Sequence, residues 1–262
     1  MIMKITIFIA IMFLLSISNI NAQSFCDKIN EIQEYQDSAG TINTKGLRVV
    51  DTATFAIDDY LALFDKLSYD PRKNIDVWYM SSGAGGYPRL YAIDKNDELN
   101  FLICKIKIKP KKASNDDFME IYEFMMDSSS FVENYITPED SEEGFLQYLF
   151  ILQMGEHFAL FWHAYYNEAY IICNQEQVDN AIGFLRGNKD FATNDEDLEN
   201  FSQISPEPEI VKKADNYTIS WIEYWTHNGI YRRTYKIDRN PPYKVSLIEE
   251  ELLVPITISF MY

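Results

Sequence analysis

The sequence predicts an α+β protein with a largely antiparallel sheet of several hairpins and with helices packed on one side of that sheet. Three observations predict this fold class. Hydrophobic residues make up 47% of the 262 residues, which is enough for a sizeable core. Segments with helical spacing of apolar residues alternate with short runs rich in β-branched and aromatic residues. The second half of the chain also contains Asn228-Gly229 between two such runs, which is the strongest hairpin signal present.

Residues 1–22 have the order of parts of a secretory signal peptide. Lys4 supplies the positive charge, an apolar run over 5–15 follows, and the segment closes on Asn21-Ala22. The run is too short for a good membrane span, and no later apolar stretch is long enough. We therefore expect a mature chain of residues 23–262 that is exported to the periplasm or the exterior and carries no membrane anchor.

The formal charge of −17 limits the classes of partner. The leader contributes only the positive charge of Lys4, so the mature chain is one unit more negative. Such a charge repels phosphate backbones and anionic lipid headgroups, which argues against nucleic acid and acidic membranes as partners. A basic protein or a cationic small molecule is compatible with it.

Three cysteines, Cys26, Cys104 and Cys173, limit the covalent cross-links. Three is an odd number, so at most one internal disulfide forms and one thiol remains. The sequence does not choose among the three pairings, and buried free thiols are equally compatible with it. A scaffold dense in disulfides is excluded.

The first third of the chain predicts two helices followed by strands. Apolar residues at helical spacing predict a helix over 24–38. They also predict a second helix that is capped by Asp51 or Thr52 and runs through Asp58 to Leu67. Strands are expected over 76–80 and 89–93, on either side of a glycine-rich turn over 81–88. A further strand is expected over 99–109, with Cys104 on its buried face and three lysines on the outer face guarding a sheet edge.

Two helices, a hairpin and a third helix are expected in the middle of the chain. The helices cover 116–126 and 137–154, the second with Thr137 as its cap and Pro138 in its first position. Residues 156–174 read as a hairpin around Asn167-Glu168, and 177–185 as a short helix. Residues 190–209 are rich in acids and read as a solvated linker with a helical turn near Leu198.

A β-rich extension over 210–262 completes a single α+β domain that covers 23–262. Its strands are expected over 217–225 and 230–237, with one or two more over 245–260. If Asn228-Gly229 is the two-residue turn, Trp225 lies opposite Arg232 and Trp221 lies opposite Lys236. Trp221, Trp225 and Arg232 then form a candidate binding surface, because Trp and Arg often anchor interfaces.

The glycine loop over 81–88 fails as a phosphate-binding motif. No Lys-Ser or Lys-Thr follows it, and the next element reads as a strand. We expect a hairpin tip in which Tyr87 and Arg89 are candidate ligand contacts.

Catalytic motifs are weak. His163, on an aromatic-lined face, is the best single catalytic candidate, but no assembled nucleophile motif accompanies it. The three histidines and three cysteines lack the spacing of a metal site, so we expect neither a metal nor another cofactor.

The leading functional hypothesis is an exported, non-catalytic binding protein, one form of which is an immunity protein that masks a basic toxin. The alternatives are a secreted hydrolase that uses His163 with nearby carboxylates, and a small-ligand carrier that uses Tyr87 and Arg89.

Overall fold

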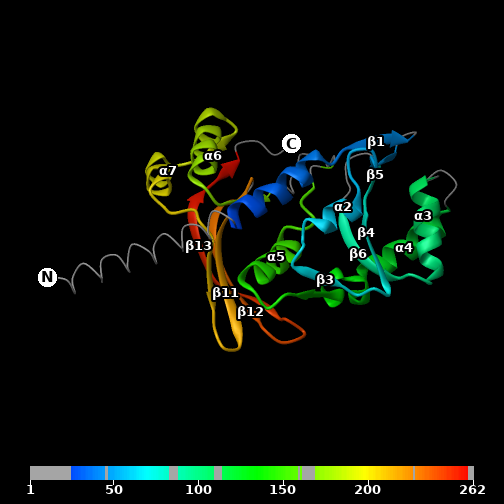
Figure 1. Cartoon of the computed structure of the whole chain (residues 1–262). Coiled ribbons are helices and arrows are strands. Elements are labelled where there is room, and N and C mark those ends of the chain that lie inside the picture. The colour runs from blue at the N-terminus through cyan, green and yellow to red at the C-terminus, as the bar shows by residue number, and fades with distance from the viewer. Residues whose placement is uncertain are drawn as a thin grey trace. The chain divides into compact units, whose positions relative to one another are not determined.

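The computed structural model describes residues 25–44, 47–82, 88–108, 114–158, 160, 169–226 and 228–258 (Figure 1). It confirms an α+β fold with antiparallel sheets. The chain divides into two compact units. We call them the terminal unit, which comprises the described parts of 1–31, 170–238 and 245–262, and the central unit, which comprises those of 32–169 and 239–244. The predicted first helix is present over 25–38, and the division falls inside it.

The terminal unit is built on a five-stranded sheet. Four strands lie in the order β10 (Glu209–Lys212), β11 (Asn216–Trp225), β12 (Gly229–Asp238) and β13 (Val245–Pro255), and β8 (Ala169–Ile172) also pairs with β11. A small antiparallel pair joins β9 (Phe191–Ala192) to β14 (Thr257–Ile258). The strands expected in the C-terminal part of the chain are therefore present.

Two helices, α6 (Gln175–Gly187) and α7 (Asp195–Ser202), pack on this sheet. α6 begins where the side chain of Asn174 accepts a hydrogen bond from the N–H of Gln177, at 2.9 Å. Its buried residues recur at helical spacing and meet Ile222, Tyr224 and Ile230 of the sheet. α7 buries Leu198 and Phe201, so a packed helix interrupts the predicted solvated linker.

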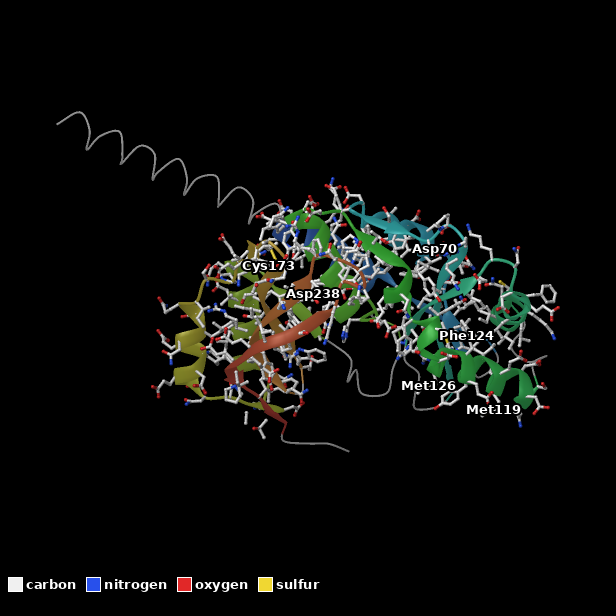
Figure 2. All side chains as sticks on the ribbon, turned by 90° about the horizontal axis from the view of Figure 1, so that it is seen from below. Asp70, Met119, Phe124, Met126, Cys173 and Asp238 are labelled. Atoms are coloured by element: carbon white, nitrogen blue, oxygen red, sulfur yellow. A yellow bond between two sulfur atoms is a disulfide. The ribbon has the colours of Figure 1, made fainter. Side chains whose placement is uncertain are left out.

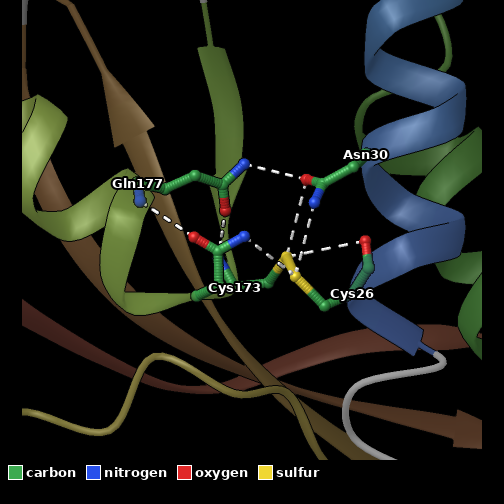
Figure 3. The surroundings of a disulfide bond; sticks show 5 residues. Cys26, Asn30, Cys173 and Gln177 are labelled. Atoms are coloured by element: carbon green, nitrogen blue, oxygen red, sulfur yellow. Dashed lines mark hydrogen bonds between the residues drawn. A yellow bond between two sulfur atoms is a disulfide. The ribbon is translucent and has the colours of Figure 1, made fainter.

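One disulfide joins Cys26 to Cys173 within the terminal unit, with 5.5 Å between the Cα atoms (Figure 3). Polar side chains surround it. The amide of Gln177 accepts a hydrogen bond from the Cys173 N–H at 2.8 Å and donates one to Asn30 Oδ1, also at 2.8 Å. The amides of Asn30 and Asn174 both approach Cys26 Sγ. The disulfide is therefore one of the three pairings that the sequence left open.

The described part of the central unit contains three small antiparallel sheets and four helices that lie wholly within it. The sheets are β1 (Thr41–Thr44) with β2 (Leu47–Val50) and β5 (Met80–Ser82), β3 (Leu67–Tyr69) with β7 (Ile136–Pro138), and β4 (Lys73–Trp78) with β6 (Arg89–Asp94). The helices among its described residues are α2 (Ile57–Ala62), α3 (Glu98–Ile108), α4 (Asn115–Met126) and α5 (Glu142–Gln153), with 3₁₀ turns over Ser128–Ser130 and Val132–Tyr135.

The predicted strand over 99–109 is wrong, because this segment forms α3. Ile103 and Ile106 are buried against β6 and α4, with Leu99 and Leu102 half-buried beside them. These four residues recur at the spacing of one helix face, a pattern that the alternation of lysines concealed. Cys104 consequently lies on the exposed side of the helix, against the expectation that it is buried.

Two further helix boundaries differ from the prediction. α5 begins after Ser141, whose hydroxyl accepts a hydrogen bond from the Gly144 N–H at 3.0 Å, while Thr137 and Pro138 belong to β7. The acids that follow Ser141 favour a helix start at this place, because they complement the positive end of the helix dipole. α2 is shorter than expected and is followed by β3 instead of further helix.

The predicted hairpin of β11 and β12 is present, but its register is different. Trp225 pairs with Gly229 and Trp221 with Arg233, so the loop covers 226–228 and Gly229 is the first residue of β12. The predicted pairs of Trp225 with Arg232 and Trp221 with Lys236 are therefore wrong. The hairpin predicted around Asn167-Glu168 has its turn outside the described residues.

Candidate functional site

The structure distributes the predicted site residues over both units. Trp221, Trp225 and Arg232 belong to the terminal unit, and Arg89 belongs to the central unit. His163 and Tyr87 lie outside the described residues, so the hydrolase hypothesis built on His163 stays a prediction.

The two tryptophans do not form an open surface. Trp221 is 1% exposed, Trp225 is half-buried, and both flank Glu223, which is itself 1% exposed. Their indole N–H groups donate hydrogen bonds to the two carboxylate oxygens of Glu223, at 2.7 Å and 2.8 Å. Arg232 lies on the other face of β12 and donates a hydrogen bond to the carbonyl of Ser205 at 3.1 Å. The structure therefore does not place Trp221, Trp225 and Arg232 on one open surface, and their role in binding stays a prediction.

Glu223 receives two more donors from β12. Tyr235 donates its hydroxyl to Oε1 at 2.8 Å, and Arg233 donates Nη1–H to Oε2 at 2.5 Å. Arg233 also donates from Nε to Glu250 at 2.7 Å. Burial, and then the charge of Glu223, raise the pKa of Tyr235 well above its ordinary value. Because each oxygen of Glu223 already accepts two hydrogen bonds, this carboxylate has no free position for a substrate or a metal ion.

Four of the exposed large apolar side chains among the described residues lie on α3 and α4 of the central unit. Phe101 on α3 is 77% exposed, and Met119, Tyr122 and Met126 on α4 are 53%, 58% and 62% exposed. The three residues of α4 are three and four positions apart, so they line one side of the helix. Figure 2 shows Met119 and Met126 along one side of α4 and Phe124 on another.

The side of α4 with Met119, Tyr122 and Met126 does not pack into the core. Ile121 and Met125, on a different side of the helix, contribute to the cluster with Tyr91 and Ile93 of β6. Phe124 packs edge-on against Tyr91, with 6.1 Å between the ring centroids. The helix therefore has one apolar side that packs and a second apolar side that remains open.

Acidic residues border the open side of α4. Asp116, Glu120 and Glu123 are exposed, and the helix contains no lysine or arginine. Asp117 differs from them, because it forms a capping box with Ser114 at the start of the helix. We call Met119, Tyr122 and Met126, together with Glu120 and Glu123, the α4 surface.

The central unit also contains a small cavity beside Arg89. Its volume is about 190 Å³, and its lining includes Arg89, Phe131, Glu133 and Glu156. Arg89 lies over the ring of Phe131, and its Nε is 4.0 Å from Glu156. Burial raises the pKa of Glu156 above its ordinary value, although the Leu90 N–H and Arg89 act in the opposite direction. This cavity is where the structure places the predicted ligand contact Arg89.

A second, more open cavity of about 470 Å³ includes Asp70 and Arg72 in its lining. Asp70, labelled in Figure 2, binds Arg72 through both carboxylate oxygens. The hydrogen bonds from Arg72 lower the pKa of Asp70 to about 2. These two charged groups satisfy each other, which makes this cavity the weaker candidate.

Among the described residues, no three or more His, Cys, Asp or Glu side chains form a cluster able to hold a metal ion. The same part of the chain contains no helix long and apolar enough to cross a membrane. Comparisons with protein families, with characterised proteins and with solved structures gave no match.

Sequence reasoning missed the α4 surface although a signal was available. The prediction of a helix over 116–126 is confirmed, and its apolar residues occupy more than one side of a helical projection. Ile121 and Met125 account for the core side, which leaves Met119, Tyr122 and Met126 unexplained. A helix that is apolar on a second side is a signal for an interface.

Proposed function

We propose that this chain is an exported interaction protein that binds a basic partner protein through the α4 surface. The observation that carries the proposal is the concentration of exposed Met and Tyr side chains on one side of α4, bordered by acids. Large apolar side chains gathered on a solvent-facing helix are typical of protein interfaces.

The chemistry of the α4 surface selects the partner. Met side chains are flexible and polarisable, so they adapt to apolar groups of different shape. Glu120 and Glu123 repel acidic partners and attract basic ones, and the net charge of −17 acts in the same direction. An amphipathic helix with a basic border fits such a stripe, because its apolar residues recur at the same spacing.

Export is part of the same proposal. Residues 1–22 have the composition of a signal peptide, and the Cys26–Cys173 disulfide suits an oxidising compartment. An immunity protein that masks a basic toxin in the periplasm is one specific form of this function. It predicts tight, salt-sensitive binding to a single cationic protein.

A synthetic peptide provides the first test. The probe is a helix-forming peptide of Leu and Lys, about 18 residues long, with its leucines at helical spacing. We expect fluorescence anisotropy to report binding to residues 23–262 that weakens as salt increases. The triple variant Met119→Ser/Tyr122→Ser/Met126→Ser is expected to weaken binding by about tenfold or more.

Matched controls distinguish binding by the α4 surface from nonspecific hydrophobic binding. The triple variant Phe184→Ser/Leu247→Ser/Ile248→Ser removes three exposed apolar side chains from the terminal unit and is expected to bind the probe normally. A probe of the same composition in scrambled order is expected to bind weakly. Equal loss in the two triple variants, or equal binding of the scrambled probe, would contradict the proposal.

A further inference from the structure

We infer that the cavity beside Arg89 binds a small zwitterion, an α-amino acid with an apolar side chain. The lining of this cavity combines one cationic group, two carboxylates and an apolar wall within the central unit. The inference concerns a site separate from the α4 surface and does not rest on the function proposed above.

Arg89 provides a place for the ligand carboxylate. The side chain of Arg89 is 40% exposed. Its guanidinium carbon lies 4.9 Å from the centroid of the Phe131 ring, and its Nε lies 4.0 Å from Oε1 of Glu156. That contact is longer than a hydrogen bond, so Glu156 does not saturate the guanidinium of Arg89, which lines the cavity. The paired N–H groups of a guanidinium match the two oxygens of a carboxylate.

Glu156 and Glu133 provide a place for the ligand ammonium. Oε1 of Glu156 accepts the Leu90 N–H at 2.8 Å, which fixes the carboxylate at the cavity wall. Glu133 lines the same cavity and is exposed. Two acids beside one arginine disfavour a purely anionic ligand, while a ligand with both charges satisfies each group.

Apolar side chains form the remaining wall of the cavity. Leu90 and Ile151 are almost fully buried, Val132 and Leu152 lie beside them, and Phe131 adds its ring. The volume of about 190 Å³ is smaller than the roughly 300–1,000 Å³ typical of pockets for drug-sized ligands. The cavity therefore suits a molecule of the size of a single amino acid with an apolar side chain.

Isothermal titration of residues 23–262 with L-leucine tests this inference. We expect measurable binding of leucine, and at least about tenfold weaker binding of N-acetyl-leucine, which lacks the ammonium, and of leucine amide, which lacks the carboxylate. The same titrations with valine, methionine and phenylalanine establish the preferred side chain.

Variants assign the binding to the cavity. Arg89→Gln and Glu156→Gln are each expected to weaken leucine binding by about tenfold or more. Glu156→Gln keeps the oxygen that accepts the Leu90 N–H, so the fold is expected to persist, and circular dichroism checks this for both variants. Arg72→Gln, which removes a guanidinium paired with Asp70 in the other cavity, is the matched control and is expected to bind normally.

Three results would overturn the inference. They are the absence of binding for all four amino acids at millimolar concentration, binding of N-acetyl-leucine as tight as that of leucine, and normal binding by a folded Arg89→Gln variant. The Met119→Ser/Tyr122→Ser/Met126→Ser variant is expected to bind leucine normally. A failure of either proposal therefore leaves the other testable.

Discussion

Four side chains of the terminal unit donate hydrogen bonds to the carboxylate of Glu223. It is 1% exposed and accepts hydrogen bonds from Trp221, Trp225, Arg233 and Tyr235. Transfer of a carboxylate out of water costs several kcal/mol, and only good geometry and complete hydrogen bonding offset this. With both oxygens doubly hydrogen-bonded and Arg233 supplying the opposite charge, Glu223 fixes four large side chains of β11 and β12 in place.

Glu223→Gln is expected to lower the free energy of unfolding by about 3 kcal/mol. The amide replaces one acceptor oxygen with a donor, so two of the four donors lose their partner and the charge of Arg233 loses its buried counterion. Urea denaturation followed by tryptophan fluorescence measures the change.

Glu250→Gln is the matched control for this prediction. Glu250 bonds the same arginine, but its side chain is 43% exposed. We expect this variant to cost no more than about 1 kcal/mol. Equal costs for the two variants would show that the buried network does not stabilise the terminal unit.

Part of this network was predictable from the residues alone. The alternation of side chains along a strand places Trp221, Glu223 and Trp225 on one face. A buried indole N–H needs a hydrogen-bond acceptor, and Glu223 is the acceptor between the two tryptophans. The partners from β12 were not predictable, because they depend on the register, which the loop over 226–228 shifts away from that of a two-residue turn.

At the scale of single elements, α3 shows how two periodicities can coexist in one segment. Cys104, Ile106 and Ile108 alternate with lysines as in a strand, while Leu99, Leu102, Ile103 and Ile106 recur as in a helix. Ile103 decides between them, because a strand would place it on the solvent face together with the lysines. Burial of Ile103 and Ile106 against the cluster with Tyr91 favours the helix.

Cys104 lies on the side of α3 that faces solvent. The native protein is expected to contain one thiol that reacts rapidly with a water-soluble disulfide reagent, because Cys104 is exposed and Cys26 is bonded to Cys173. Cys104→Ala is expected to change stability by less than about 0.5 kcal/mol, whereas Ile106→Ala costs about 3 kcal/mol. A thiol that reacts only after denaturation would instead support the buried strand.

The start of β12 depends on a glycine. Gly229 has φ of +136°, and an added Cβ would lie 2.6 Å from the carbonyl oxygen of Val254 on β13. Gly229→Ala is therefore expected to lower the free energy of unfolding by about 2 kcal/mol, through backbone strain and this clash. Thermal denaturation followed by circular dichroism measures the difference.

Gly183→Ala is the matched control in the same unit. Gly183 lies on the exposed side of α6, and a Cβ there meets no atom within 4 Å. Alanine at this position is expected to stabilise by about 0.5–1 kcal/mol, because it has the higher helix propensity. Opposite signs for the two variants are the expected result, and stabilisation by both would contradict the close approach of β13 to Gly229.

At the scale of the whole chain, the pattern of apolar and polar residues predicted the fold class and most helices and strands. This was possible because the spacing of apolar residues and the residue types of turns are local properties of the sequence. The helices over 25–38 and at α4 and α6, and the strands of the C-terminal part, follow from such signals. The choice of strand partners does not follow from local signals, because β3 pairs with β7, which lies far from it in the sequence. Pairing between distant segments depends on packing that no local pattern encodes. The sequence left the pairing of the cysteines undetermined for the same reason, because Cys26 and Cys173 are far apart in the sequence.

The Cys26–Cys173 disulfide links stability to the compartment in which the protein folds. It joins residues 147 positions apart, so it removes much of the conformational freedom of the unfolded chain. Loss of the cross-link in Cys26→Ser/Cys173→Ser is expected to lower the free energy of unfolding by about 4 kcal/mol. Cys104→Ser is the matched control, because it removes a cysteine that takes no part in the disulfide.

Expression of residues 1–262 in a Gram-negative host tests export and disulfide formation together. We expect the periplasmic protein to begin at Gln23 and to carry one free thiol, because the leader is removed and the periplasm oxidises Cys26 with Cys173. Residues 23–262 made in the cytoplasm are expected to carry three free thiols and to unfold at lower urea. Intact mass measures removal of the leader, and thiol titration measures formation of the disulfide.

A full-length chain that stays in the cytoplasm with its leader intact would contradict export. Stability that is unaffected by reduction would contradict the role assigned to the disulfide.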